Sequence, residues 1–185
     1  MDKKLSPTTP LDGFHTKIGG VSLTEVNPEI FCISIPKKMG KQIEKETKRI
    51  LELNIPIVGQ SSLNKSSNIR LIRNSIDQFF ILFENSSDVS AVMKPLEKYF
   101  YITEQSDAWV GIKISGESSY SCLERICPLD LSSDAFAVNT AVRTLMEHLN
   151  VLIIKTSDAS FLLLSASSSA KSFLDAVETS ARNIT

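Results

Sequence analysis

The chain has 185 residues, a length typical of one compact domain or of two small halves that share a core. Its formal net charge of −1 argues against a nucleic-acid partner, and no apolar run approaches the ~20 residues of a membrane span. Three cysteines without the spacing of a disulfide framework indicate reduced thiols and a cytoplasmic protein.

In the first half of the chain, short strands are predicted to alternate with amphipathic helices. Residues 1–20, which contain Pro7 and Pro10, are expected to form a flexible N-terminal tail. Asp88 or Ser87 is the predicted cap of the second helix, and the serine-rich segment 58–68 is a predicted mobile loop. β-branched and aromatic residues predict strands at 21–26, 31–35, 69–73, 79–83 and 99–105, the third and fourth as a hairpin. Helical spacing of apolar residues predicts helices at 37–53 and 88–99.

The second half repeats this order. Strands are predicted at 109–114, 138–145, 151–155 and 161–165, and helices at 117–126 and 168–181. Each half is approximately β-α-β-β-α. This order predicts an α+β fold of two ferredoxin-like halves, about 21–105 and 106–185, in a single domain with mixed or antiparallel sheets.

Cys127, in the stretch "ERICPLDLSSDAF", is the first candidate for chemistry. A reactive cysteine needs a depressed pKa, whereas this residue stands at a predicted helix C-terminus, where the helix dipole disfavours a thiolate. Cys122, Leu123, Ile126 and Cys127 fall on one apolar stripe, and Pro128 is a common residue after a helix end. The pattern favours both cysteines as small core residues.

Other candidate sites also favour structural interpretations. Neither the cysteines nor the two histidines form a ligand cluster with metal spacing. Asp130 and Asp134 could be acid–base groups, but aspartates next to serines after a helix more commonly cap turns. The basic face of 37–49 could attract an acidic partner or a polyglutamate tail, although a solvated face is the commoner explanation. Phosphate-binding glycine motifs and a G-x-S-x-G elbow do not occur. The residues alone therefore predict no active site.

A set of short motifs in residues 102–155, with "SIDQFFIL" at 75–82, resembles the gamma subunit of heterotetrameric sarcosine oxidase. The matching motifs are Glu104-x-Ser106-Asp107, Ser115-Gly116, Cys127-Pro128-Leu129-Asp130-Leu131, Phe136, Arg143-Thr144 and Val151-Leu152. The sequence departs from that pattern where Glu104 replaces an aspartate and Asn139 replaces a glycine, and 165–173 lacks an expected arginine.

The resemblance implies the fold of the folate-binding domain of the glycine-cleavage T protein and a role in one-carbon metabolism. It implies a complex that oxidatively demethylates sarcosine, with FAD, FMN, NAD and tetrahydrofolate on other subunits and none on this chain. The implied partners are the alpha, beta and delta subunits, and this chain would be a gamma subunit without an active site. The positions implied to be structural or interfacial are Ser106, Asp107, Gly116, Cys127, Pro128, Asp130, Phe136, Arg143 and Thr144.

Two alternatives stay open at this point. The chain could be a stand-alone folate-binding or aminomethyl-transfer module, for which Glu104 and Asp107 are the candidate carboxylates. It could also be a scaffold that serves another methylamine-related dehydrogenase.

Overall fold

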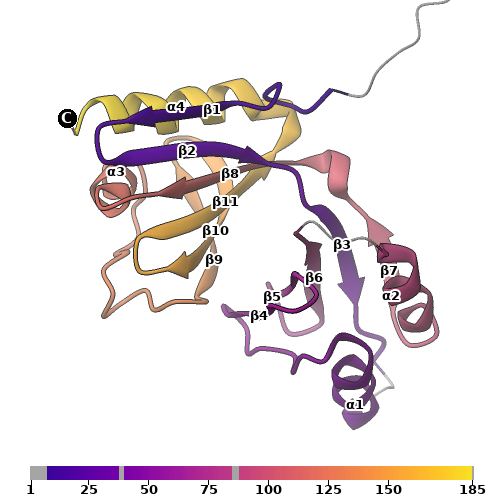
Figure 1. Cartoon of the computed structure of the whole chain (residues 1–185). Helices are drawn as coiled ribbons and strands as arrows, with labels where there is room; N and C mark the ends of the chain where they lie inside the picture. The colour runs from indigo at the N-terminus through magenta and orange to yellow at the C-terminus, as the bar shows by residue number, and fades with distance from the viewer. Residues whose placement is uncertain (1–7, 38–39, 85–87, 185) are drawn as a thin grey trace, which may run out of the picture.

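Two antiparallel sheets form the centre of the molecule (Figure 1). The structure is a computed structural model, and it describes residues 8–37, 40–84 and 88–184. The first sheet has the order β1 (His15–Ile18), β2 (Val21–Val26), β8 (Trp109–Ser115), β11 (Ser160–Ala166), β10 (Leu149–Ser157) and β9 (Ala141–Met146). The second has the order β4 (Ser61–Asn64), β5 (Ile69–Arg73), β6 (Gln78–Phe83), β3 (Glu29–Ser34) and β7 (Tyr101–Glu104).

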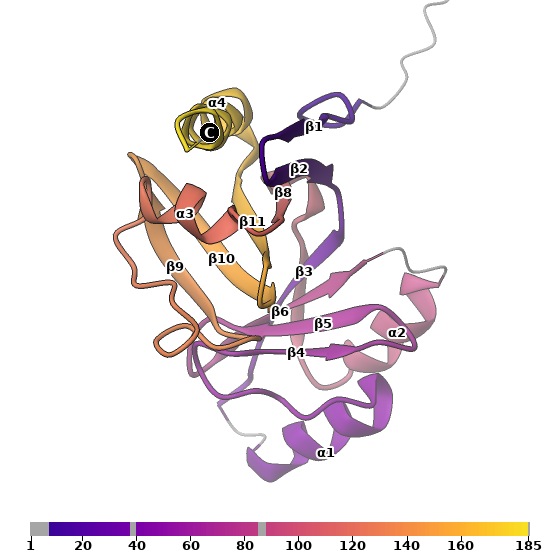
Figure 2. The same cartoon turned by 60° about the vertical axis from the view of Figure 1, so that its left-hand side comes forward.

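Helices cover the outer face of each sheet, so that the chain folds into four layers (Figure 2). Helices α1 (Gly40–Leu51) and α2 (Val89–Leu96) pack on the five-stranded sheet. Helices α3 (Ser119–Glu124) and α4 (Ala170–Arg182) pack on the six-stranded sheet. Among the described residues, no helix is long and apolar enough to cross a membrane.

The uninterrupted apolar strands are explained by burial on both faces. Phe79 and Ile81 of β6 point into the cluster with α1 and α2, while Phe80 and Leu82 belong to the cluster between the two sheets. Successive side chains of a strand point to opposite faces, so a strand buried on both sides has no position that favours a polar residue. β11 follows the same rule in the six-stranded sheet.

The two halves of the chain repeat one topology. β3-α1-β4-β5-β6-α2 corresponds to β8-α3-β9-β10-β11-α4, and in both cases the first strand pairs with the last and the last with the one before it. Each half thus has one strand more than the approximate β-α-β-β-α order, although only β4, in the first half, was not among the individually predicted strands. The α+β class and the antiparallel sheets agree with the prediction, whereas the ferredoxin-like description of the halves is not confirmed.

Two segments that were predicted to be irregular contain strands. In the predicted loop 58–68, Ser61–Asn64 form β4, a short polar edge strand that pairs with β5. In the predicted tail, residues 15–18 form β1, and residues 1–7 lie outside the described residues. Polar edge strands lack the apolar pattern on which strand prediction depends, and this explains both errors.

The buried side chain of Glu25 holds the segment before β1. Its carboxylate accepts hydrogen bonds from Leu11 N at 2.9 Å, from Gly13 N at 2.6 Å and from Thr9 Oγ1 at 2.8 Å. A carboxylate that gathers three donors in this way fixes the loop onto β2. Residues 9–13 are therefore part of the folded domain.

Helix α2 begins as predicted at one of its two candidate caps. Asp88 Oδ1 accepts a hydrogen bond from Ala91 N at 3.0 Å, which confirms Asp88 as the N-cap, while Ser87 lies outside the described residues. The helix ends at Leu96, three residues before the predicted end, and Pro95 lies in its last turn. Proline inside a helix was expected to kink the helix or delay its start, whereas α2 starts at Val89 and ends one residue after Pro95.

Candidate functional site

The motif Glu104-x-Ser106-Asp107 forms the crossing from one sheet to the other. The chain leaves β7, passes through the 3-10 turn Ser106–Ala108 and enters β8. Ser106 N donates to Glu104 Oε1 at 2.9 Å, and Ile30 N of β3 donates to Ser106 Oγ at 3.0 Å. Hydrogen bonds from the Ser106 side chain and backbone hold the pKa of Glu104 below its ordinary value. The motif therefore fixes the crossing to β3.

Beside this crossing, the structure brings together three of the predicted charged residues. Glu104, Asp107 and Arg143 line an open groove of about 760 Å³ together with Trp109. The Arg143 guanidinium carbon lies 5.6 Å from the centroid of the Trp109 ring, within the range of a cation–π interaction. Since Glu104 is engaged by Ser106, Asp107 and Arg143 are the groups that could contact a ligand in this groove.

Most of the other motif residues lie away from the groove. Cys127 and Phe136 are buried in the core under α3 and α4, and Thr144 is half-buried on β9. Pro128 is exposed in the turn that follows α3. Gly116 has φ +125°, and a Cβ there would overlap the carbonyl oxygen of Gly20. These residues serve packing or turn geometry at separate places in the fold, and they do not form a shared site.

The predictions for the cysteines and for Asp130 agree with the local structure. Cys122 and Cys127 are buried, and burial raises the pKa of the Cys122 thiol. Asp130 Oδ1 accepts a hydrogen bond from Ser132 N at 2.9 Å, and hydrogen bonds with Ser132 lower the pKa of Asp130. Asp134 is exposed. Within the described ranges, no three histidine, cysteine, aspartate or glutamate side chains are grouped so that they could hold a metal ion.

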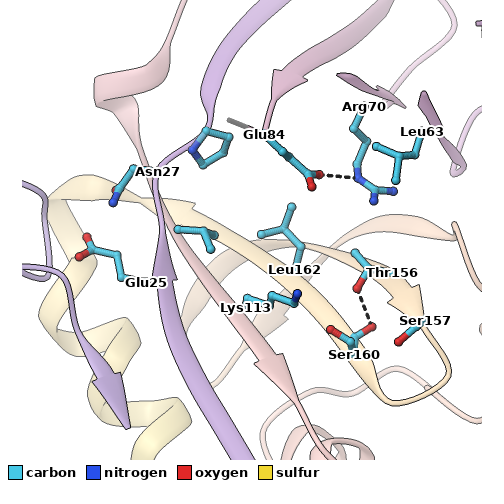
Figure 3. Close-up of a pocket in the computed structure, with 12 residues that line it drawn as sticks. Glu25, Asn27, Leu63, Arg70, Glu84, Lys113, Thr156, Ser157, Ser160 and Leu162 are labelled. Atoms are coloured by element: carbon cyan, nitrogen blue, oxygen red, sulfur yellow. Dashed lines mark hydrogen bonds and ion pairs between the residues drawn. The ribbon is translucent and has the colours of Figure 1, made fainter. Parts of the chain in front are cut away.

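A second cavity, which the sequence analysis did not predict, lies where the two sheets meet (Figure 3). It has a volume of about 660 Å³ and lies next to the apolar cluster between the sheets, with which it shares Leu162. We call it the inter-sheet cleft. Its charged lining residues are Arg70 of β5, Lys113 of β8, Glu84 after β6, and Glu25 of β2.

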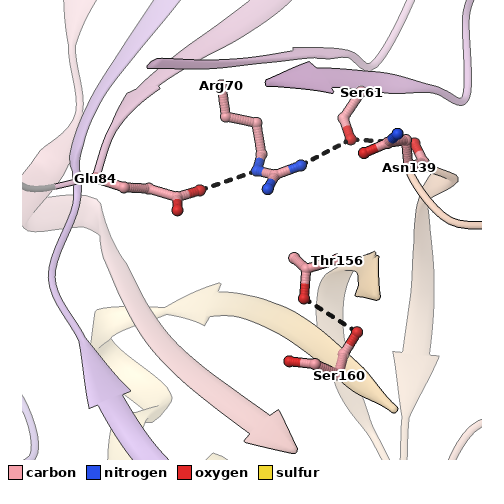
Figure 4. A network of polar contacts seen from close by, with 6 residues as sticks. All are labelled: Ser61, Arg70, Glu84, Asn139, Thr156 and Ser160. Carbon is pink, nitrogen blue, oxygen red and sulfur yellow. Dashed lines mark hydrogen bonds and ion pairs between the residues drawn. The ribbon is translucent and has the colours of Figure 1, made fainter. Parts of the chain in front are cut away.

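Arg70 is the centre of a polar network that joins the two halves of the chain (Figure 4). The residue is only 2% exposed. Its Nε donates to Glu84 Oε1 at 2.9 Å and its Nη1 to Ser61 Oγ at 3.3 Å. Ser61 in turn donates from N and Oγ to the carbonyl oxygen of Asn139, at 2.7 and 3.1 Å.

Asn139, which replaces an expected glycine, has φ +73°. This is the left-handed region that glycine adopts freely, and asparagine is among the side chains that tolerate it best. The substitution therefore keeps the backbone turn that presents the Asn139 carbonyl oxygen to Ser61.

Ser160, at the start of β11, contributes a buried hydroxyl to the cleft lining. Its carbonyl oxygen accepts from Thr156 Oγ1 at 3.1 Å, but its own Oγ is buried without a hydrogen-bond partner in the described structure. The register of β10 shifts between Lys155 and Ser157, just before this turn, and such bulges commonly occur beside functional sites.

A weak sequence signal for the cleft did exist. Arg70 interrupts the apolar run "IRLIR", and Lys113 interrupts "WVGIKI". A charge inside an otherwise apolar strand indicates either a solvated face or a polar site, and only the sheet pairing shows that these two charges line one cavity.

No protein-family model matches the chain, and no curated protein matches its sequence. Among solved structures, the fold is similar to a chain of the heterotetrameric sarcosine oxidase from Corynebacterium sp. U-96, with a TM-score of 0.80 and 17% identity. That match covers 96% of this chain and 95% of the other. The chain is also similar to the glycine cleavage system aminomethyltransferase T from Bartonella henselae, with a TM-score of 0.66 and 12% identity over 88% of this chain and 46% of that one. The chain therefore has the fold that these proteins share.

Proposed function

We propose that this chain is a non-catalytic structural subunit, equivalent to gamma, of a heterotetrameric sarcosine-oxidase-like flavoenzyme. The observation that carries the proposal is the match in fold over nearly the whole length of both chains, 96% and 95%. A match over the full length of both chains favours the interpretation that they are equivalent subunits, because two proteins that share only one module would match over part of their length. The ordered motifs of residues 102–155 support the same family.

The roles of the motif residues support a chain without its own chemistry. The carboxylate of Glu104 is engaged by Ser106, Cys127 is buried, and Gly116 makes a close backbone approach. Each of these residue types could serve a reaction, but here the local contacts give it a structural task. This is the distribution expected of a scaffold subunit.

An exposed apolar patch supports assembly with larger partners. Ile57 is 74% exposed and Ile76 is 80% exposed. Arg73 holds their two loops together, because its Nη1 donates to Pro56 O at 3.4 Å and its Nη2 to Ile76 O at 2.6 Å. Neighbouring large apolar side chains that are exposed to water are characteristic of contact surfaces.

In the proposed complex, the other subunits are alpha, beta and delta. They would carry FAD, FMN, NAD and tetrahydrofolate, and together they would oxidise sarcosine to glycine in the cytoplasm. This chain would hold those subunits in place.

The test is a gentle pull-down of the tagged chain from its native host, with copurifying masses, flavin absorbance and sarcosine-dependent peroxide as readouts. We expect larger flavin-containing partners. The double variant Ile57→Ser, Ile76→Ser should lose them, whereas Tyr120→Ser, which alters an exposed aromatic residue on α3, should retain them. Flavoprotein partners that oxidise a different methylamine would instead identify the chain as a scaffold of another dehydrogenase.

A colourless chain without partners would contradict the proposal. The stand-alone folate-binding alternative would then be tested by calorimetric titration with tetrahydrofolate. Asp107 lines the open groove, so Asp107→Asn should abolish the binding heat if that alternative holds.

A further inference from the structure

The four charged side chains of the inter-sheet cleft differ in whether they already have a partner. The carboxylate of Glu25 is directed to the loop at residues 9–13, where it accepts three hydrogen bonds, and Glu84 is paired with Arg70 at 2.9 Å. Lys113 is exposed on β8 and has no carboxylate partner among the described residues. Figure 3 shows its ammonium group in the middle of the cleft, between the sheet that carries Arg70 and the turn that carries Ser160. The two positive and two negative side chains of the lining therefore balance in number, but Lys113 is the one of the four that has no hydrogen-bond or ion-pair partner among the described residues and can pair with an anion.

Hydrogen-bond donors in the cleft remain available to a ligand. Of the five N–H groups of Arg70, two donate to Glu84 and Ser61, and no acceptor for the others occurs among the described residues. Ser160 is only 7% exposed, and its buried Oγ has no partner in this part of the chain. Buried polar groups are normally satisfied, so an unpartnered hydroxyl in a cavity wall is a donor available to a ligand.

Apolar side chains form the rest of the lining. Val26 and Pro28 lie at the β2–β3 crossing, while Leu63 and Leu162 extend the apolar surface on either side. A volume of about 660 Å³ is in the range of cavities that hold small organic molecules. Such walls add affinity for a ligand that carries an apolar body as well as a charge.

We propose that the inter-sheet cleft binds a small organic anion, a carboxylate attached to an apolar body. The carboxylate lies between the Lys113 ammonium and the Arg70 guanidinium, and Ser160 Oγ donates to it. The body of the ligand rests against Val26 and Leu162. This inference needs no partner subunit, so it stands or fails independently of the proposed function.

The probe for the test is 2-naphthoate, with the neutral 2-naphthamide as the matched control ligand and inorganic phosphate as the compact anion. Binding to the purified full chain is measured by fluorescence and calorimetry. We expect 2-naphthoate to bind at least about tenfold more tightly than either control, because loss of a charged hydrogen bond weakens binding about that much. Equal affinity for 2-naphthoate and 2-naphthamide would show that the cleft binds the apolar ring and not the carboxylate, and this would overturn the proposal. A preference for phosphate would overturn it as well.

Two variants locate the binding in this cleft. Lys113→Met should weaken 2-naphthoate binding about tenfold, whereas Lys17→Met, which removes another exposed strand lysine outside the cleft, should not change it. Ser160→Ala should weaken binding while leaving the melting temperature unchanged or raised, since it removes a buried hydroxyl that lacks a partner. Unchanged binding in both cleft variants, or a lower melting temperature of Ser160→Ala with unchanged binding, would overturn the assignment.

Discussion

Replacement of Gly116 by alanine should strongly destabilise the fold, because two steric problems meet at this residue. Its φ of +125° is one that residues with a Cβ rarely adopt, and such strain costs on the order of 1–3 kcal/mol. The new Cβ would also overlap the carbonyl oxygen of Gly20, in the turn between β1 and β2. Relief of an overlap by backbone movement costs roughly 1–3 kcal/mol more.

The sum is a loss of about 4 kcal/mol in the free energy of unfolding. For a domain of this size, each kcal/mol lowers the melting temperature by roughly 2–4 °C, so the expected shift is on the order of 8–16 °C. The assay is urea and thermal unfolding of the purified chain, followed by circular dichroism.

The control is Gly59→Ala, which separates the two costs. Gly59 has φ +84°, but nothing lies within 4 Å of an added Cβ. This variant therefore suffers the left-handed conformation alone and should lose roughly 1–2 kcal/mol. If Gly116→Ala lost no more than Gly59→Ala, the close approach to Gly20 would be relieved by a cheap movement, and the reasoning would be refuted.

Three further predictions concern stability, pH and thiol reactivity. Asn139→Val should lower the free energy of unfolding by about 1–2 kcal/mol in urea titrations, because a β-branched residue is strained in the left-handed conformation of this position. Asn139→Gly should leave the free energy of unfolding nearly unchanged, because glycine adopts that conformation freely. For Glu104, the folded pKa lies below the ordinary 4.5, so its stabilisation is present above that pH and is lost as the pH falls through the folded value. Glu104→Gln should therefore flatten the stability curve in that acid range, and an unchanged curve would contradict this. The three buried cysteines should react with a thiol reagent at least about tenfold more slowly in the native chain than in urea, since burial raises the pKa of Cys32 and Cys122. A thiol that reacts at once in the native chain would contradict the core assignment.

The sequence predicted the parts of the fold that depend on apolar pattern. The strand at 21–26 and the hairpin of 69–73 with 79–83 agree closely with β2, β5 and β6, because those strands are buried and rich in β-branched and aromatic residues. Strands β1 and β4 were missed because they are polar edge strands that lack the apolar pattern, although each pairs with the next strand along the chain.

The candidate site was less predictable for a different reason. The burial of Cys127 follows from the apolar stripe that it shares with Cys122 and Leu123, and the turn at Asp130 follows from the next two residues. The inter-sheet cleft instead requires Arg70 of one half to face Lys113 of the other. No local pattern contains that information, because it arises only when the two sheets pack together.

The internal repeat explains why both cavities occur where they do. In the first half, β7 follows α2 and pairs with β3, whereas in the second half the corresponding place beside β8 is taken by β2, which precedes both halves of the repeat. The chain therefore crosses between the sheets twice, from β2 to β3 and from β7 to β8 (Figure 1).

Each crossing parts the two sheets locally and leaves a cavity beside it. Asn27 and Pro28 of the first crossing line the inter-sheet cleft, while Gln105 and Asp107 of the second line the open groove. At the second crossing, Ser106 uses its hydrogen bonds to fix the chain to Glu104 and Ile30. At the first, Lys113 and Ser160 Oγ have no partner among the described residues, which is why ligand binding is better supported there than at the sequence motif.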